Sequence, residues 1–188
     1  MHFPGAKIED FTSKSGKKVI LRYIQEDDAV ELCRYINELS KEDTFIRFSG
    51  ETISLGEEQK YVQDQIAKIL RGDATPIVVL HDDTIIGHSS VERNFIDKKR
   101  GLHIGDFGLS VAREYRGDWI GQKLMETVIE QAKTQMHDLK IIRLNVYGSN
   151  SAAQNLYKKM GFQEYGRLPE GVLYKKEYLD LIEMYLAI

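Results

Sequence analysis

Two stretches decide the fold: GLSVAREYRGDWIGQKLMETVIEQAK at residues 108–133 and IIRLNVYGSNSAAQNLYKKMGF at residues 141–162. In the first, an apolar run that ends at Val111 leads into a glycine-containing turn and then into apolar residues at helical spacing. In the second, apolar and polar residues alternate up to Tyr147, and helical spacing follows. Both stretches are therefore predicted to be strand-to-helix junctions.

The turn of the first junction, residues 116–122, has the composition of an anion site. The first N–H groups of a helix have no partner within the helix, and the helix dipole favours negative charge there. Gly117 and Gly121 would let the backbone approach a ligand closely, and Arg116 and Gln122 supply a charged and a neutral donor. By itself the turn is equally consistent with an ordinary strand-to-helix connection.

The helix of the second junction is predicted to begin at Asn150 and to carry Tyr157 on the same face. Seven residues separate the two, so at 3.6 residues per turn their side chains point only about 20° apart. Ala153 lies one turn along the same face and leaves room for a ligand. Alternatively, Asn150 is only a helix cap and Tyr157 only a packing aromatic.

Together these residues resemble the paired motifs of the GCN5-related N-acetyltransferase (GNAT) superfamily. The first is the loop R/Q-x-x-G-x-G/A, which holds the pyrophosphate of acyl-CoA; here Trp119 stands where a Gly is usual, and Asp118 is an acid beside the anion site. The second, N-x-x-A-x-x-x-Y-x-x-x-G-F, is complete in Asn150, Ala153, Tyr157, Gly161 and Phe162.

The resemblance implies an α+β fold, an α/β/α sandwich with a mixed, mostly antiparallel central sheet and helices on both faces. It implies a single GNAT domain over residues 1–188, in which residues 1–16 form an added N-terminal strand or arm. It also implies acetyl-CoA as the co-substrate, with Val111 pairing with the pantetheine arm, Asn150 binding a pantetheine amide and Tyr157 reaching the thioester sulfur. The implied cofactor-binding residues are Val111, Arg116, Gly117, Asp118, Trp119, Ile120, Gly121, Gln122, Asn150 and Ala153.

A catalytic base is also needed, because a protonated amine cannot attack a thioester. The candidates are Glu92 on one predicted strand and Asp106 or His103 on the next. Strand alternation puts His103 and Asp106 on opposite faces, so they are not expected to act as a pair. Each is also consistent with an ordinary polar strand residue.

The remaining patterns predict the elements that frame these junctions. A buried helical stripe is expected at Ala29, Leu32, Cys33, Ile36 and Leu39, after a cap at Asp27 or Asp28. The other predicted elements are hairpins at 7–23 and 76–93, a helix at 55–70 stopped by Gly72, a charged loop at 96–100, a strand at 102–112 and a terminal strand at 178–188.

The composition of the chain indicates which classes of partner, compartment and metal site are to be expected. With 26 basic and 29 acidic residues the net charge is −3, which disfavours nucleic acid as a partner, and no run of eighteen uncharged apolar residues indicates a membrane span. The single Cys33 excludes an intramolecular disulfide, so a reducing cytoplasm is expected. The five histidines show no metal-ligand spacing, and no metal is expected.

The leading hypothesis is an N-acetyltransferase that moves acetyl from acetyl-CoA to a primary amine of a small molecule or peptide by direct attack in a ternary complex. The alternative is a non-catalytic acyl-CoA sensor or interaction domain. Exposed edge strands would also allow a homodimer. A cation-friendly acceptor pocket would draw on Glu57, Glu58, Asp64, Tyr174, Tyr178 and Asp180.

Overall fold

The computed structural model describes residues 3–93 and 98–188 and contains two compact units. The first unit comprises Met1–Glu92 and Gly108–His137, and the second comprises Arg93–Phe107 and Asp138–Ile188. Strand β5 (Ile104–Val111) belongs to both, because it crosses from the second unit into the first after Phe107. Each unit is described by itself.

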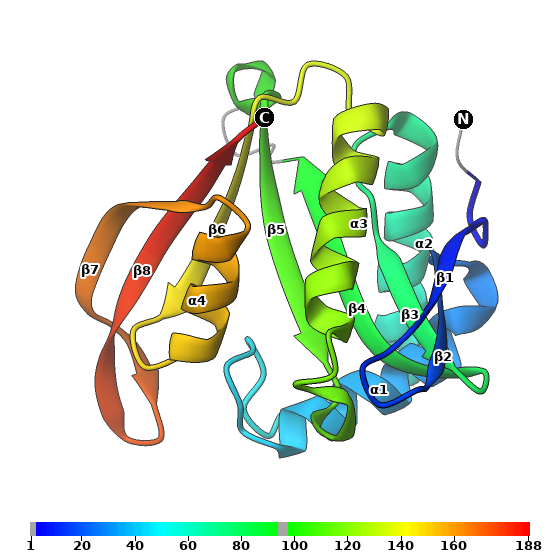
Figure 1. The fold of residues 1–188 in the computed structure, drawn as a ribbon, viewed down its shortest axis with the longest axis horizontal. Helices are drawn as coiled ribbons and strands as arrows, with labels where there is room; N and C mark the ends of the chain where they lie inside the picture. Colours follow the sequence, from blue (N-terminus) through cyan, green and yellow to red (C-terminus); the bar gives the residue numbers. More distant parts are fainter. Residues whose placement is uncertain (1–2, 94–97) are drawn as a thin grey trace. The chain divides into compact units, whose positions relative to one another are not determined.

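The strands of the first unit form antiparallel hairpins, as predicted (Figure 1). The first hairpin joins β1 (Lys7–Thr12) to β2 (Lys18–Tyr23), and the second joins β3 (Ile77–His81) to β4 (Thr84–Arg93). Strands β2 and β3 are also antiparallel neighbours. The second hairpin turns at Asp82–Asp83, both with positive φ (47° and 62°), which matches the twist of the flanking strands.

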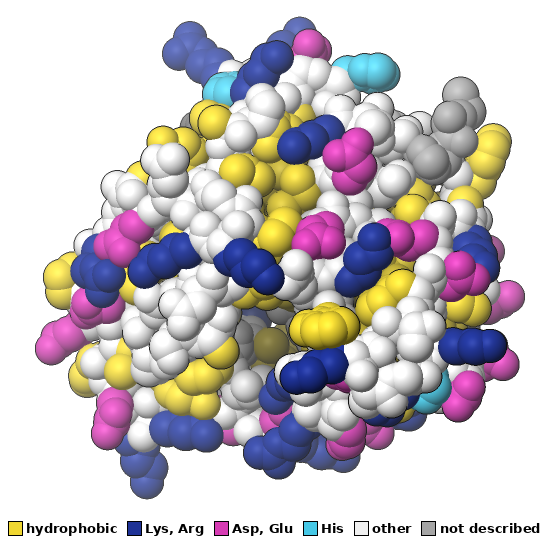
Figure 2. Space-filling view, viewed as in Figure 1, with side chains coloured by type: hydrophobic (Ala, Val, Ile, Leu, Met, Phe, Trp, Pro, Cys, Tyr) yellow, Lys and Arg dark blue, Asp and Glu magenta, His cyan; other side chains and the backbone are white. Residues whose placement is uncertain are grey.

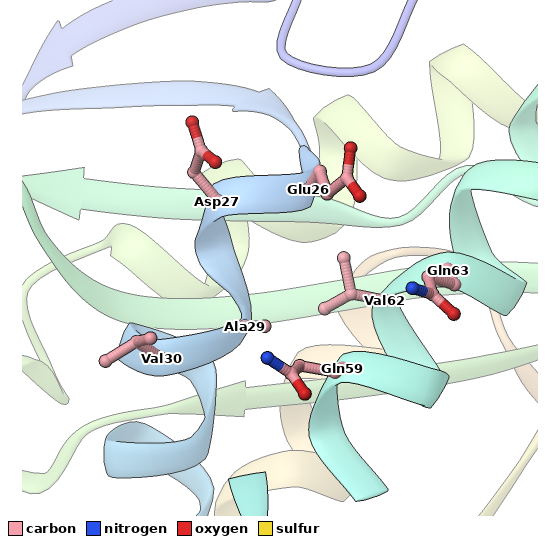
Figure 3. A pocket seen from close by; sticks show the side chains of 7 residues that line it. All are labelled: Glu26, Asp27, Ala29, Val30, Gln59, Val62 and Gln63. Atoms are coloured by element: carbon pink, nitrogen blue, oxygen red, sulfur yellow. The ribbon is translucent and has the colours of Figure 1, made fainter. Parts of the chain in front are cut away.

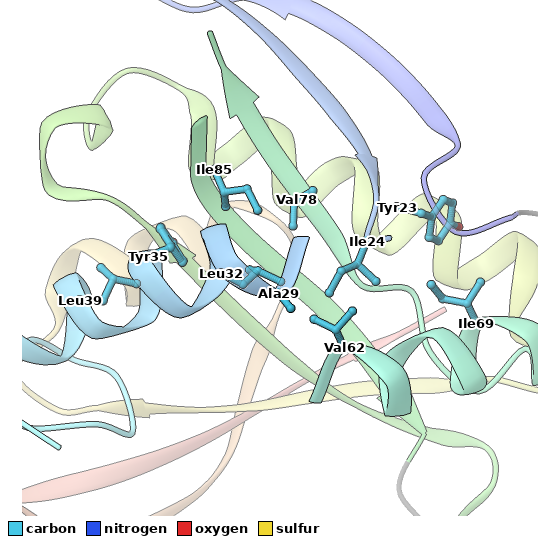
Figure 4. Packing of buried hydrophobic residues seen from close by; sticks show 10 residues of the cluster. All are labelled: Tyr23, Ile24, Ala29, Leu32, Tyr35, Leu39, Val62, Ile69, Val78 and Ile85. Atoms are coloured by element: carbon cyan, nitrogen blue, oxygen red, sulfur yellow. The ribbon is translucent and has the colours of Figure 1, made fainter. Parts of the chain in front are cut away.

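Helices cover both faces of this part of the sheet. Helices α1 (Ala29–Lys41, after the 3-10 turn Glu26–Asp28) and α2 (Leu55–Arg71) build the core on one face (Figure 4). Helix α3 (Ile120–Gln135) packs on the other face, where a Cβ on Gly87 would lie 3.6 Å from Leu124 Cδ2. The core cluster on the first face comprises Tyr23, Ile24, Ala29, Leu32, Tyr35, Leu39, Val62, Ile69, Val78 and Ile85.

The predicted buried stripe of α1 was wrong in part. Cys33 and Ile36 are only half-buried, whereas Tyr35 is 2% exposed and packs in the core. The aromatic ring fills the face while its hydroxyl donates to Ser110 Oγ at 3.0 Å, which satisfies the buried polar atom. Helix α2 begins at Leu55 as predicted and ends at Arg71, one residue beyond the predicted end. Ser54 caps its start, and the left-handed Gly72, with φ 71°, ends it as predicted.

The second unit contains the first half of β5, β6 (Ile141–Tyr147), α4 (Ser151–Lys159), β7 (Gln163–Tyr174) and β8 (Glu177–Ala187). The strand order is β5-β6-β8-β7, in which β5 and β6 are parallel and the other pairs antiparallel. The predicted charged loop at 96–100 lies partly outside the described residues; its later part belongs to a 3-10 turn, Lys98–Gly101.

The fold class is therefore the predicted one: α+β, with a mixed, mostly antiparallel set of eight strands and four α-helices among the described residues. On the face shown in Figure 2, basic and acidic side chains are interspersed, in keeping with the net charge of −3. None of the helices in the described part of the chain combines the length and the apolarity that a bilayer crossing requires.

Candidate functional site

The turn between β5 and α3 in the first unit is built from a short 3-10 segment and two left-handed residues. Strand β5 ends at Val111, η3 spans Arg113–Tyr115, and Gly117 and Trp119 have φ of 74° and 64°. The fully buried Ile120 then begins α3. A left-handed conformation costs a non-glycine residue about 1–2 kcal/mol, which explains why Gly is the usual residue where Trp119 stands.

Arg116 holds this turn in place through its side chain. Its Nε donates to the Val111 carbonyl at 2.8 Å, and its Nη2 lies 2.8 Å from Glu42 Oε2 at the end of α1. The predicted direct bond from this guanidinium to a diphosphate would require it to share or leave these partners. Arg116 thus fixes the end of β5 to the end of α1, and no sequence pattern indicated Glu42 as its partner.

Asp118, the acid beside the predicted anion site, faces the N-terminal hairpin. Its carboxylate accepts hydrogen bonds from Ser13 Oγ at 2.8 Å, Ser15 N at 2.6 Å and Ser15 Oγ at 2.6 Å, and Lys17 Nζ lies 3.5 Å away. These bonds, led by the Ser15 hydroxyl, lower the pKa of Asp118 to about 2. Because its charge is compensated within the protein, Asp118 is compatible with an anion bound at the adjacent turn.

Gly121 and Gln122 lie in the first turn of α3. A Cβ at Gly121 would meet Val111 Cγ2 at 3.6 Å and Leu109 Cδ2 at 3.9 Å, which are ordinary contacts. The protein itself therefore does not require glycine at this position. Gln122 Nε2 donates to Glu126 Oε1 at 2.7 Å along the helix, so its predicted role as a neutral donor competes with this bond.

In the second unit, Asn150 caps α4 as its residue type predicts. Its Oδ1 accepts from the Ala153 N–H at 3.2 Å, and its own carbonyl accepts from Gln154 N at 3.1 Å. The carboxamide nitrogen belongs to the same group and remains chemically able to donate to an amide carbonyl. The two readings of Asn150, helix cap and pantetheine ligand, are thus compatible.

Tyr157 is 9% exposed and lies among aromatic rings of its own unit. Its ring meets Phe107 edge to face at a centroid distance of 6.1 Å and Phe162 at 6.0 Å. Burial raises the pKa of the Tyr157 hydroxyl to about 12. The phenol is therefore protonated across the working range of an enzyme and can act only as a hydrogen-bond donor or a weak acid.

Of the three candidate bases, His103 is exposed, and Glu92 and Asp106 lie in different surroundings. Glu92 Oε2 accepts from Gln65 Nε2 at 3.1 Å, and its Oε1 pairs with Lys68 Nζ, so both oxygens are engaged by α2. Asp106 Oδ1 accepts from Arg143 Nε at 2.5 Å, and Asp106 is exposed. Because it neighbours Phe107 in a strand, its side chain leaves the sheet on the face opposite to Tyr157.

The residues considered for a cation-friendly acceptor pocket are divided between the two units, and each is described within its own unit. Glu57 closes the capping box of α2 with Ser54, Asp64 forms an ion pair with Lys68, and Glu58 is buried. In the second unit Asp180 pairs with Arg167 at 3.0 Å. The remaining two are aromatic: Tyr174 packs on Tyr147, and Tyr178 is 66% exposed.

One pocket of about 340 Å³ lies in the first unit between the start of α1 and α2 (Figure 3). Two carboxylates and two carboxamides contribute to its lining, but it contains none of the predicted site residues. Its lining residues are Glu26, Asp27, Ala29, Val30, Gln59, Val62 and Gln63.

Two features together indicate the class of this protein. The first is a mixed sheet with helices α1 to α4 in the order given above, and the second is a pair of strand-to-helix junctions, one with a left-handed turn before α3 and one with the Asn-capped, Tyr-bearing helix α4. Comparison with known proteins identifies that class. The model of the acetyltransferase (GNAT) family matches residues 35–162, and the chain belongs to this family. Acetyl-CoA is the family's co-substrate.

Relatives and solved structures agree with the family. The L-amino acid N-acetyltransferase AaaT of Escherichia coli strain K12 is 28% identical over 108 residues, which is 57% of this chain and 65% of the relative's length. An acetyltransferase of the GNAT family from Streptococcus pneumoniae has a TM-score of 0.82 and 26% identity and covers 90% of this chain and 99% of its own. A putative acetyltransferase from Salmonella typhimurium, solved with acetyl-CoA, has a TM-score of 0.77 and 17% identity and covers 90% of this chain and 93% of its own, which shows the shared fold.

Proposed function

We propose that the chain is an acetyl-CoA-dependent N-acetyltransferase that acts on a primary amine by direct attack in a ternary complex. The observation that carries this proposal is the buried Tyr157 on α4, seven residues from the capping Asn150 and with a pKa of about 12. A buried, protonated phenol is suited to donate a hydrogen bond to a leaving thiolate. We further propose that both units belong to one catalytic domain, since the family match at 35–162 includes parts of both.

In this proposal the residues of the β5–α3 turn bind the diphosphate through backbone N–H groups. Arg116 holds the turn through Val111 and Glu42, and Gly121 keeps the approach to the helix open. Asn150 and Ala153 would receive the pantetheine arm. The proposed cofactor-binding residues are those of the family motifs: Val111, Arg116, Gly117, Asp118, Trp119, Ile120, Gly121, Gln122, Asn150 and Ala153.

The chemical step joins the amine nitrogen to the acetyl carbon and breaks the bond from that carbon to sulfur. The amine loses one proton, and the thiolate gains one to leave as free thiol. With a Tyr157 pKa of about 12 and a thiol pKa of about 8.5, full transfer from the phenol is uphill by roughly 5 kcal/mol. Tyr157 therefore acts by hydrogen bonding to the departing sulfur, and the thiolate is protonated afterwards from solvent.

Glu92 remains our proposed proton acceptor, since it is half-buried and within reach of a polar face of α2. It would have to exchange Lys68 for the incoming amine. Asp106 receives less support, because it is exposed and pairs with Arg143, whereas Glu92 is half-buried.

The acceptor that we would test first is the α-amino group of a free amino acid, because of the similarity to the E. coli L-amino acid N-acetyltransferase AaaT. Small peptides and other primary amines are the next class. We also propose a reducing cytoplasm as the site of action, in keeping with the lone Cys33.

The engagement of both Glu92 oxygens and of Asp106 favours one second candidate, a CoA-binding sensor without turnover. A free-thiol assay with acetyl-CoA and a panel of amino acids, peptides and polyamines separates the two. We expect amine-dependent thiol release that is lost in Tyr157→Phe. Tight CoA binding without release on any amine would establish the sensor instead.

A further inference from the structure

Trp119 combines an exposed side chain with a backbone conformation that suits glycine. Its indole is 61% exposed, and its φ is 64°. It is also the only tryptophan in the chain. A residue of this size in a left-handed conformation on the surface needs a reason that the fold alone does not supply.

The residues on either side impose both the conformation and the outward direction. Asp118 is 8% exposed and is fixed by its bonds to Ser13 and Ser15, while Ile120 is fully buried. A residue between two such anchors cannot relax its backbone without breaking one of them. The indole is therefore presented to solvent at a fixed place, directly before the first turn of α3.

Two lysines belong to the hairpin turn that contacts Asp118, the residue before Trp119. The backbone N–H of Lys14 donates to the Asp118 carbonyl at 3.4 Å, and Lys17 Nζ lies 3.5 Å from Asp118 Oδ2. Lys14 is exposed and Lys17 half-buried. An exposed aromatic face next to cations matches a ligand that carries both a π-system and phosphate.

We propose that Trp119 is the platform on which the adenine of CoA stacks, with Lys14 and Lys17 facing the adenosine 3′-phosphate. This rests on the proposed function, because the adenosine is covalently joined to the diphosphate that the 116–122 turn would bind. Stacking of a nucleobase on an aromatic side chain stabilises a complex for any base. The contact should therefore raise the affinity for CoA above that for pantetheine phosphates that lack the adenosine. The strain at residue 119 is then retained for an interaction made only in the complex.

Two matched variants separate the contribution of the aromatic ring to CoA binding from that of the backbone conformation. Trp119→Asn removes the ring and tolerates the left-handed conformation, whereas Trp119→Phe keeps an aromatic face with the same strain. The probes are CoA and 4′-phosphopantetheine, which lacks the adenosine. We expect Trp119→Asn to weaken CoA about tenfold or more with no change for 4′-phosphopantetheine, and Trp119→Phe to retain most of the CoA affinity in calorimetric titration.

Because Trp119 is the only tryptophan in the sequence, the intrinsic tryptophan fluorescence monitors ligand binding at this residue. We expect CoA to change its fluorescence and 4′-phosphopantetheine to leave it unaltered. If CoA binds the wild type with unchanged fluorescence, and binds Trp119→Asn equally well, the stacking proposal is wrong while the acetyl-CoA site stands. If the wild type binds no CoA at all, both the platform and the proposed function fall.

Discussion

The backbone N–H of Ser15 donates to the Asp118 carboxylate at 2.6 Å, across 103 residues of sequence. This bond joins the turn of the N-terminal hairpin to the turn that precedes α3. The first sixteen residues, which the sequence suggested to be an added strand or arm, thereby buttress the proposed diphosphate turn.

Asp118→Asn should weaken the dependence of the free energy of unfolding on pH in the acidic range. The pKa of Asp118 is about 2 in the folded chain against an ordinary 3.8, so its stabilising effect is complete above pH 3.8 and is lost as the pH falls from 3.8 towards 2. We expect Asp118→Asn to be less stable than the wild type at pH 7 and nearly equal to it near pH 2, by urea unfolding at several pH values.

Asp10→Asn is the matched control for this experiment. Asp10 lies in the N-terminal hairpin that Asp118 contacts, and it pairs with Lys7. Its side chain is 66% exposed, and exposed ion pairs contribute little to the free energy of unfolding. A similar pH dependence for the Asp10 and Asp118 variants would contradict the role given to Asp118.

Tyr157→Phe should lower kcat about 100-fold and leave the Kd for CoA unchanged. The phenyl ring keeps the packing against Phe107 and Phe162, and only the hydroxyl offered to the leaving sulfur is lost. Because the pKa of Tyr157 is about 12, its ionisation should cause no alkaline fall in kcat below pH 10. Steady-state kinetics would refute the role if kcat matched that of Tyr165→Phe, a variant on exposed β7.

Glu92→Gln should lower kcat at unchanged acetyl-CoA affinity, whereas Asp106→Asn should behave as the wild type. The contrast follows from the exposure of Asp106 and its pairing with Arg143, whereas Glu92 is half-buried. Lys68→Gln is the informative control, because it frees one oxygen of Glu92 and should preserve turnover. An unchanged kcat in both carboxylate variants would exclude both residues as bases.

Gly121→Ala should stabilise the fold by about 0.5–1 kcal/mol and yet weaken CoA binding, and Gly121→Trp should abolish it. Alanine is the better helix former, and its Cβ meets Val111 only at an ordinary 3.6 Å. The loss of binding would then come from the ligand side alone. Gly56→Ala, also in a first helical turn and with open space around it, should leave the titration unchanged.

Elements with strong local signals were predictable from the sequence. The end of α2 follows from Gly72, and the β3–β4 turn follows from two adjacent aspartates that accept a left-handed backbone. Asn150 likewise caps α4 as its residue type suggests. Each of these depends only on neighbours within a few residues.

The partners of the site residues were not predictable, because they come from distant elements. No local pattern indicates that Arg116 meets Glu42 or that Asp118 meets Ser13 and Ser15. Tyr35 was missed for another reason: a stripe drawn from aliphatic residues passes over a tyrosine whose hydroxyl finds a buried partner.

The pairing of β7 and β8 has a consequence for how the chain is made. Strand β8 lies between β6 and β7, and in the described residues β7 pairs with β8 alone. During translation β7 leaves the ribosome before β8. The backbone hydrogen-bonding groups of β7 therefore have no strand partner until β8 has paired with β6. The second unit can therefore close only after β8 has left the ribosome, and a substitution that weakens the pairing of β8 with β6 would also separate β7 from the rest of the sheet.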